Sequence, residues 1–208
     1  ADNYPGRGWM QMINDFFDEN TVIINQGASG RSSKSFRTEG LWNKVISRVK
    51  PGDYVFIQFG HNDAKPDSLR HTDPQTSFKE NIRNYVKEVR AKGANPILFT
   101  SIVRRSFGTN GKLIDTHGEY VTVVRDLAKE MKVPLIDLNK MSAEMVEKQG
   151  PEESKKLYMY VEAGVTPKLP KGKKDDTHLN EYGASKIAEL AIQGLKDINS
   201  PLVKNLKK

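Results

Sequence analysis

The stretch DYVFIQFGHND, residues 53–63, decides how this chain is expected to fold. Its first half is a short and nearly continuous apolar run, which is typical of a strand buried on both faces of a sheet. Gly60 then permits a sharp turn, and His61, Asn62 and Asp63 follow it. In open α/β sheets, ligands bind beyond the carboxyl ends of the strands. The stretch therefore predicts a buried strand that delivers polar side chains to a binding site.

Apolar strands and amphipathic helices alternate on both sides of this stretch. Further strands are predicted over residues 21–25, 96–100 and 133–138, and helices over residues 9–17, 42–49, 78–93, 120–131 and 187–195. Strands separated by helices pair in parallel through right-handed crossovers. We therefore expect an α/β fold, a three-layer α/β/α sandwich with a parallel sheet, in a single domain over residues 1–208.

Composition excludes several classes of protein. Hydrophobic residues make up 37% and charged residues 28% of the 208 residues, and no apolar run approaches the ~18 residues of a spanning helix. The chain has no cysteine, which excludes disulfides and thiolate zinc sites, and no histidine pair has metal-ligand spacing. We expect no metal or organic cofactor. The net charge of +7 fits a solvated surface or an acidic polysaccharide. Nucleic acid is a weaker alternative, because no binding motif accompanies the charge.

A candidate acid–base pair lies just before the last predicted helix. His178 can take and return a proton near neutral pH, provided that a partner fixes its tautomer. Asp175 stands three residues earlier, so a turn can bring its carboxylate to the ring, whereas Asp176 lacks this spacing. Alone, the pattern is equally typical of a capping aspartate and a surface histidine.

Two more loops carry groups that could stabilise an oxyanion. The Asn62 amide can donate to such a charge, as can backbone amides in the glycine-containing turn around Gly30. Alternatives are an Asx turn at Asn62, a flexible loop at Gly30 and a purely structural His61. Because both loops and the Asp175 region follow predicted parallel strands, the sequence predicts that they converge.

Together these motifs resemble the SGNH (GDSL) hydrolase family. The resemblance rests on Gly30, on the Gly-His-Asn-Asp run of residues 60–63 and on Asp-x-x-His at residues 175–178. It implies a five-stranded, parallel, flavodoxin-like fold in which Gly30 and Asn62 bind the oxyanion, Asp175 orients His178, and His178 is the base. Arg31 and His61, in the same two loops, are candidates for substrate binding.

The resemblance can be narrowed to one group of proteins within this family. Four segments are similar to rhamnogalacturonan acetylesterases and their bacterial relatives, in order and in spacing: residues 7–9, 25–32, 59–63 and 176–183. This resemblance implies an acetylated, acidic pectic substrate and a periplasmic or extracellular location. The lysine-rich stretch over residues 150–174 is expected by default to be a solvated loop, and the alternative is that its lysines contact substrate.

The family's first block, Gly-Asp-Ser, holds the nucleophile and is not found in residues 1–208. We expect it, with the family's first strand, upstream of Ala1, so that the chain as written is inactive by itself. Ser29, Ser32 and Ser33 are weaker candidates for the nucleophile. Alternatives for the function are an esterase acting on xylan, sialic acid or lipid esters, and a noncatalytic carbohydrate-binding relative.

Overall fold

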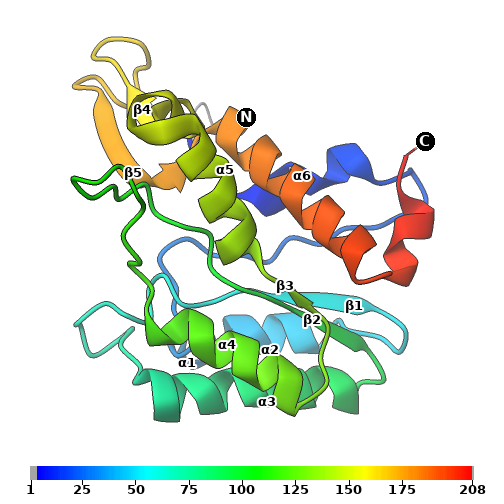
Figure 1. Ribbon diagram of the computed structural model, residues 1–208. Coiled ribbons are helices and arrows are strands. Elements are labelled where there is room, and N and C mark those ends of the chain that lie inside the picture. Colours follow the sequence, from blue (N-terminus) through cyan, green and yellow to red (C-terminus); the bar gives the residue numbers. More distant parts are fainter. Residues whose placement is uncertain (1–3, 208) are drawn as a thin grey trace. The chain divides into compact units, whose positions relative to one another are not determined.

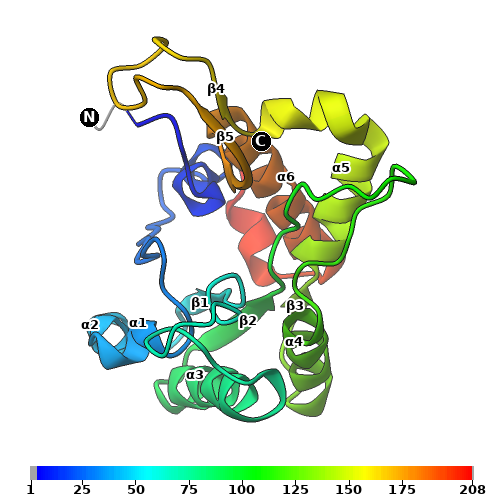
Figure 2. The ribbon, with the colours of Figure 1, turned by 90° about the vertical axis from the view of Figure 1, so that its left-hand side faces the viewer.

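The computed structural model describes residues 4–207, which form two compact units. The first, here called the sheet unit, comprises residues 26–101 and 117–139. The second, called the hairpin unit, comprises residues 4–25, 102–116 and 140–207. Figures 1 and 2 show the elements of both units in two views.

The sheet unit is built on a parallel sheet with the strand order β1-β2-β3. Its elements in chain order are α1 (Ser35–Thr38), α2 (Leu41–Ile46), β1 (Tyr54–Ile57), η3 (Pro74–Phe78), α3 (Lys79–Ala91), β2 (Asn95–Phe99), α4 (Glu119–Glu130) and β3 (Leu135–Ile136). The predicted α/β architecture with a parallel sheet is confirmed. In the part of the chain that the structure describes, this sheet has three strands, fewer than the five that the resemblance implies.

Helices α3 and α4 cover one face of this sheet (Figure 1). α3 places Ile82, Tyr85 and Val89 at helical spacing, and all three are fully buried. The Trp42 ring meets Tyr85 edge-on with 4.6 Å between ring centroids. Burying a side chain of this size contributes ~1.5–3 kcal/mol to stability. This core fixes β1 and thereby the loop that begins at Gly60.

The hairpin unit pairs β4 and β5 in an antiparallel ribbon. Its elements are η1 (Trp9–Gln11), η2 (Ile13–Phe16), most of α5 (Leu138–Glu153), η4 (Ser154–Leu157), β4 (Tyr158–Val161), β5 (Lys173–Leu179), α6 (Glu181–Asp197) and η5 (Pro201–Asn205). α6 packs against η1, η2, η4 and η5. α5 breaks at Gly150, whose φ is +76°.

Two predicted elements near the N-terminus are wrong. Residues 9–17 form two short 3₁₀ turns that meet at Met12 instead of one helix, and Phe17 has an extended backbone and pairs with Leu206. Residues 21–25 do not form a strand. β-Branched residues gain their strand preference from packing against neighbouring strands. Here the side chains of Val22 and Ile24 are 84% and 58% exposed.

The prediction of a solvated loop over residues 150–174 is wrong for its ends. The end of α5, η4, β4 and the start of β5 lie within it, and Tyr158 and Met159 are buried. The tip around Lys168 and Lys171 is exposed, as expected. A run of charged residues hid the short apolar segment at residues 157–161 that makes β4.

No helix within residues 4–207 has both the length and the apolar character that crossing a membrane requires.

Candidate active site

Asp175 and His178 lie on strand β5 instead of the predicted loop, and a β-bulge brings them together. Met159 of β4 lies opposite Asp175, and its neighbour Tyr158 lies opposite Leu179. Residues 176–178 therefore have no counterpart on β4. In a regular strand, residues three apart point to opposite faces, but a bulge bends the strand and re-aims its side chains. Asp175 Oδ1 fixes the bend by accepting the backbone N–H groups of Thr177 and His178 at 2.8 and 2.9 Å.

The other carboxylate oxygen holds the imidazole ring. His178 Nδ1 lies 2.8 Å from Asp175 Oδ2. With Nδ1 as the donor to this carboxylate, the ring nitrogen Nε2 keeps its lone pair and can act as a general base. The His178 side chain is 63% exposed, so the ring is accessible, whereas that of Asp175 is only 14% exposed.

The charge of Asp175 is strongly stabilised. Burial by itself raises the pKa of this carboxyl group, but the Lys173 ammonium, the backbone N–H groups of His178 and Thr177, and the His178 ring outweigh it. Together they hold the pKa of Asp175 well below its usual range. The carboxylate is therefore ionised throughout the pH range in which a histidine base works.

Asp176, the neighbouring carboxylate, is bound to a different set of groups. Its Oδ1 accepts the Tyr160 hydroxyl at 2.7 Å and lies 3.2 Å from Arg105 Nε. Its carbonyl accepts the Arg105 backbone N–H at 2.8 Å. These contacts tie residues 102–116 to the bulge. The two adjacent aspartates thus have separate partners, and Asp175 is the one that reaches His178.

The start of α6 fixes the other side of the bulge. Asn180 caps the helix by accepting the Gly183 N–H at 2.8 Å, and its own amide donates to the carbonyls of Lys156 and Tyr158. The Arg7 N–H donates to the Leu179 carbonyl at 3.0 Å. His178 therefore stands between a capped helix and a hydrogen-bonded strand end.

In the sheet unit, the buried Asp63 joins the two glycine-containing loops. Its carboxylate accepts the Ser33 N–H at 3.0 Å, the Ser33 hydroxyl, the Gly60 N–H at 3.1 Å and the Thr72 hydroxyl at 2.9 Å. Burial raises the pKa of Asp63, and the bonds from Ser33, Thr72 and Gly60 oppose that rise. This carboxylate organises both loops, a role that the sequence did not indicate.

The two predicted oxyanion donors belong to these joined loops. Asn62 Nδ2 donates to the Arg31 carbonyl at 3.2 Å, which uses one of its two N–H groups. Gly30 has a φ of +77°, a conformation that favours glycine. Gly60 has a φ of +133°, and a Cβ there would lie 2.7 Å from Ser101 Oγ. The sheet unit thus brings the loop around Gly30 next to the Asn62 loop.

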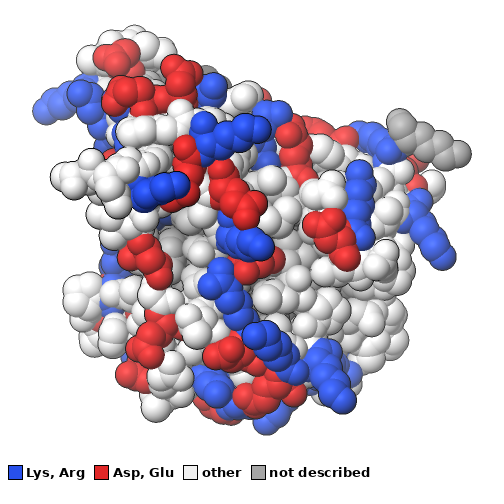
Figure 3. All heavy atoms as spheres, in the orientation of Figure 1, with Lys and Arg blue, Asp and Glu red and all other residues white. Residues whose placement is uncertain are grey.

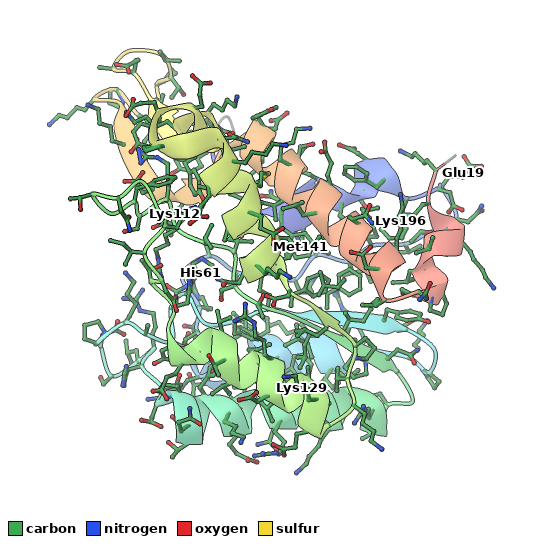
Figure 4. The ribbon with its side chains drawn as sticks, viewed as in Figure 1. Glu19, His61, Lys112, Lys129, Met141 and Lys196 are labelled. Carbon is green, nitrogen blue, oxygen red and sulfur yellow. The ribbon has the colours of Figure 1, made fainter. Side chains whose placement is uncertain are left out.

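The two candidate substrate-binding residues have partners within the same unit. Arg31 Nε pairs with Glu39 at 2.9 Å, and its Nη1 donates to the Ser29 carbonyl. The His61 ring, labelled in Figure 4, meets the His117 ring edge-on with 4.5 Å between centroids. Binding of substrate by Arg31 and His61 stays a prediction.

The serines of the first loop differ in exposure. Ser32 and Ser33 are fully buried, and their hydroxyls bond to Ser35 and Asp63 respectively. Their hydroxyls therefore serve the loop itself, which argues against either of them as the nucleophile. Ser29 is exposed.

Among residues 4–207, no group of three or more His, Asp and Glu side chains is placed to hold a metal ion. Acid–base chemistry by the Asp175–His178 pair is what the described groups of the hairpin unit offer.

Comparison with known proteins decides the family. The model of the GDSL-like lipase/acylhydrolase family matches residues 1–186. The chain belongs to this family. The Bacillus subtilis rhamnogalacturonan acetylesterase RhgT is 38% identical over 202 residues, which cover 97% of this chain and 86% of that protein. The probable rhamnogalacturonan acetylesterase YesY of the same organism is 33% identical over 204 residues, which cover 97% of this chain and 88% of that protein.

Solved structures share the fold of this chain. The structure of the B. subtilis protein YxiM has a TM-score of 0.82 and 32% identity, covering 96% of this chain and 52% of that chain. This chain therefore spans about half of that protein. The structure of an acetyl xylan esterase has a TM-score of 0.60 and 20% identity. The match covers 81% of this chain and 78% of that chain, and it shows the shared fold.

Proposed function

We propose that the protein is a carbohydrate O-acetylesterase that removes acetyl groups from a rhamnogalacturonan-like pectic polysaccharide. The observation that carries the proposal is the Asp175–His178 pair at 2.8 Å in a chain whose relatives, RhgT and YesY, bear the name rhamnogalacturonan acetylesterase. The two relatives align over nearly the whole chain, so the proposal does not depend on one motif. We also propose a periplasmic or extracellular location, which the same resemblance favours.

In the proposed mechanism, the nucleophile is the serine of the family's Gly-Asp-Ser block, upstream of Ala1. His178 Nε2 takes the hydroxyl proton as the serine oxygen attacks the acetyl carbonyl. Asp175 keeps the proton on Nδ1 and stabilises the imidazolium that forms. The tetrahedral intermediate collapses when the sugar oxygen leaves with the proton from His178. Water, deprotonated by His178, then hydrolyses the acetyl-enzyme and releases acetate.

The oxyanion of this intermediate needs hydrogen-bond donors. We assign this role to the Gly30 N–H, to the Asn62 N–H that the Arg31 carbonyl leaves unused, and to the amide of the serine itself. A preorganised donor of this kind contributes ~3–4 kcal/mol to transition-state stabilisation. Asp63 supports both loops, because its carboxylate binds Ser33 beside one loop and Gly60 at the start of the other.

The test compares neighbouring residues on β5 in the protein that carries the upstream serine. Acetate release from acetylated rhamnogalacturonan should fall by about a thousandfold or more in H178A and in D175N, since both remove the base or its orientation. D176N is the matched control, because Asp176 binds Tyr160 and Arg105 and does not contact the ring. It should lose less than about tenfold.

Circular dichroism must show that all three variants are folded. Wild-type turnover in H178A would overturn the proposed mechanism. Hydrolysis of acetylated xylan, sialic acid or lipid esters in preference to rhamnogalacturonan would move the substrate to another acyl ester. Binding of the polysaccharide without release of acetate would make the protein a noncatalytic relative.

A further inference from the structure

Lys173 binds the same carboxylate oxygen as the candidate base. Its Nζ lies 2.9 Å from Asp175 Oδ2, and His178 Nδ1 lies 2.8 Å from that atom. The second oxygen, Oδ1, is taken by two backbone N–H groups. Both oxygens of Asp175 are therefore occupied, and one of them is shared between an ammonium and an imidazole.

Strand β5 places Lys173 beside Asp175, and a contact with Tyr4 also holds its ammonium. Lys173 and Asp175 are two residues apart on β5, so their side chains share one face of the strand. Nζ also lies 3.1 Å from the Tyr4 hydroxyl and 5.9 Å from the centre of its ring. The Lys173 side chain is 30% exposed. An ammonium held from two sides keeps a defined position, unlike a freely solvated lysine.

The charge of Lys173 is maintained. Its hydrogen bond to Asp175 is the main cause that raises the pKa of Lys173, against the opposing effect of burial, and the Tyr4 hydroxyl adds to the rise. Lys173 therefore remains a cation across the working pH range of a histidine base.

The neighbouring segments of the hairpin unit carry other charged and titratable groups. On β5 and β4 they are Lys174, Asp176 and Tyr160; on the loop over residues 102–116, Arg105; on the N-terminal segment, Tyr4 and Arg7; and on α6, Glu181. Most of these groups have an ion-pair or hydrogen-bond partner among themselves. Asp176 is bound by Arg105 and Tyr160, and Arg7 Nε lies 3.9 Å from Glu181. Lys173 is the cation that touches Asp175 itself.

We infer that Lys173 is a positioning residue that sets the pH range of the Asp175–His178 pair. The inference rests on the proposed function for the role of His178 as the base. When His178 takes the serine proton, the site holds two cations on one carboxylate oxygen. Their repulsion, and the division of the Asp175 charge between them, disfavour the imidazolium. Lys173 therefore keeps His178 in its neutral, basic form at a lower pH than Asp175 alone would allow.

The decisive experiment follows the His178 ring by NMR as the pH is varied, because this readout needs no substrate. In K173M the midpoint of the His178 Hε1 titration should rise by about 0.5 pH unit, an effect of the size expected for a partly exposed pair. K173R retains the cation and should restore the midpoint to within about 0.2 unit. K174M removes the same charge from the next residue, which is exposed and lies opposite Tyr160, and should leave the midpoint unmoved.

Kinetics supply the second readout. In the protein that carries the upstream serine, the acidic half of the kcat/KM profile should move to higher pH in K173M by the same amount as the NMR midpoint. A midpoint that is unchanged or lower in K173M overturns the inference, and so does loss of plateau activity without a change in midpoint. Absence of ester hydrolysis in every variant, together with the NMR shift, contradicts the proposed function and leaves the lysine effect established.

Discussion

The pKa values of two aspartates of this protein, Asp63 and Asp175, are shifted in opposite directions by their surroundings. The buried Asp63 has a raised pKa because desolvation dominates, although Ser33 and Thr72 donate to it. Asp175 has a lowered pKa because Lys173 and several N–H groups outweigh desolvation. Such opposite environments separate structural from catalytic carboxyl groups in many enzymes. Here the carboxylate with the lowered pKa is the one that can stabilise an imidazolium.

The lowered pKa of Asp175 predicts how stability depends on pH. A carboxyl group whose folded-state pKa lies below its unfolded value stabilises the protein above that unfolded value, and the stabilisation is lost as the pH falls through the folded pKa. The free energy of unfolding of the wild type, minus that of D175N, should therefore be constant above about pH 5 and shrink steadily toward about pH 2.5. Urea unfolding at several pH values measures this difference. A difference that does not change below pH 4 contradicts the prediction.

Among individual residues, the sequence predicted the Asp175–His178 pair and did not predict the contact of Lys173 with Asp175. Asp175 and His178 could be predicted because three-residue spacing before a helix brings a carboxylate back to a ring. Lys173 could not, because its spacing from Asp175 matters only when both lie on a strand, and the segment was expected to be a loop. The Tyr4 contact joins residues 169 apart in the sequence, which only the folded chain brings together.

The position of the pair depends on how α6 and η4 meet. Gly183, in the first turn of α6, lies against the backbone of Leu157, the last residue of η4. A Cβ on Gly183 would lie 1.9 Å from the Leu157 carbonyl oxygen, a distance that no side-chain adjustment can relieve. The same carbonyl accepts the Asn180 N–H at 3.2 Å. The close approach of the two backbones thus fixes the helix start next to His178.

G183A should therefore destabilise the protein by about 3 kcal/mol, the upper part of the range for overpacking in a close-packed region. Chemical unfolding measures this loss. G8A is the matched control within the hairpin unit, because a Cβ at Gly8 meets only the flexible Gln11 side chain at 3.7 Å. It should change stability by less than about 0.5 kcal/mol. Equal stabilities of G183A and G8A would show that α6 and η4 separate at little cost.

The elements that the sequence predicted well are those with a complete apolar stripe. α3 buries Ile82, Tyr85, Val86 and Val89, and its prediction is confirmed. The elements that it missed depend on partners distant in sequence. β4 is short and follows charged residues, and the run at residues 21–25 has strand propensity without forming a strand. Propensity is a weak guide where pairing decides the conformation.

The whole chain carries a net charge of +7 at pH 7. Figure 3 shows acidic and basic side chains mixed on the face in view, so the positive surplus there is spread among opposite charges. A surplus of this kind attracts an acidic polymer over a distance, which raises the encounter rate without requiring a dedicated basic site. Such attraction is screened by salt, whereas the chemistry of acetyl transfer is not.

This difference gives a prediction for the whole molecule. Raising the NaCl concentration from ~0.02 to ~0.5 M shortens the Debye length to a few ångströms. For acetylated rhamnogalacturonan, which is acidic, kcat/KM should fall several-fold, mainly through KM, because long-range attraction is lost. For a small neutral acetyl ester it should stay nearly constant, since the ester carries no charge to be attracted. Comparing the two substrates in the same protein separates attraction from any effect of salt on the fold. Equal salt dependence for both would show that the positive charge has no part in recognising the polymer.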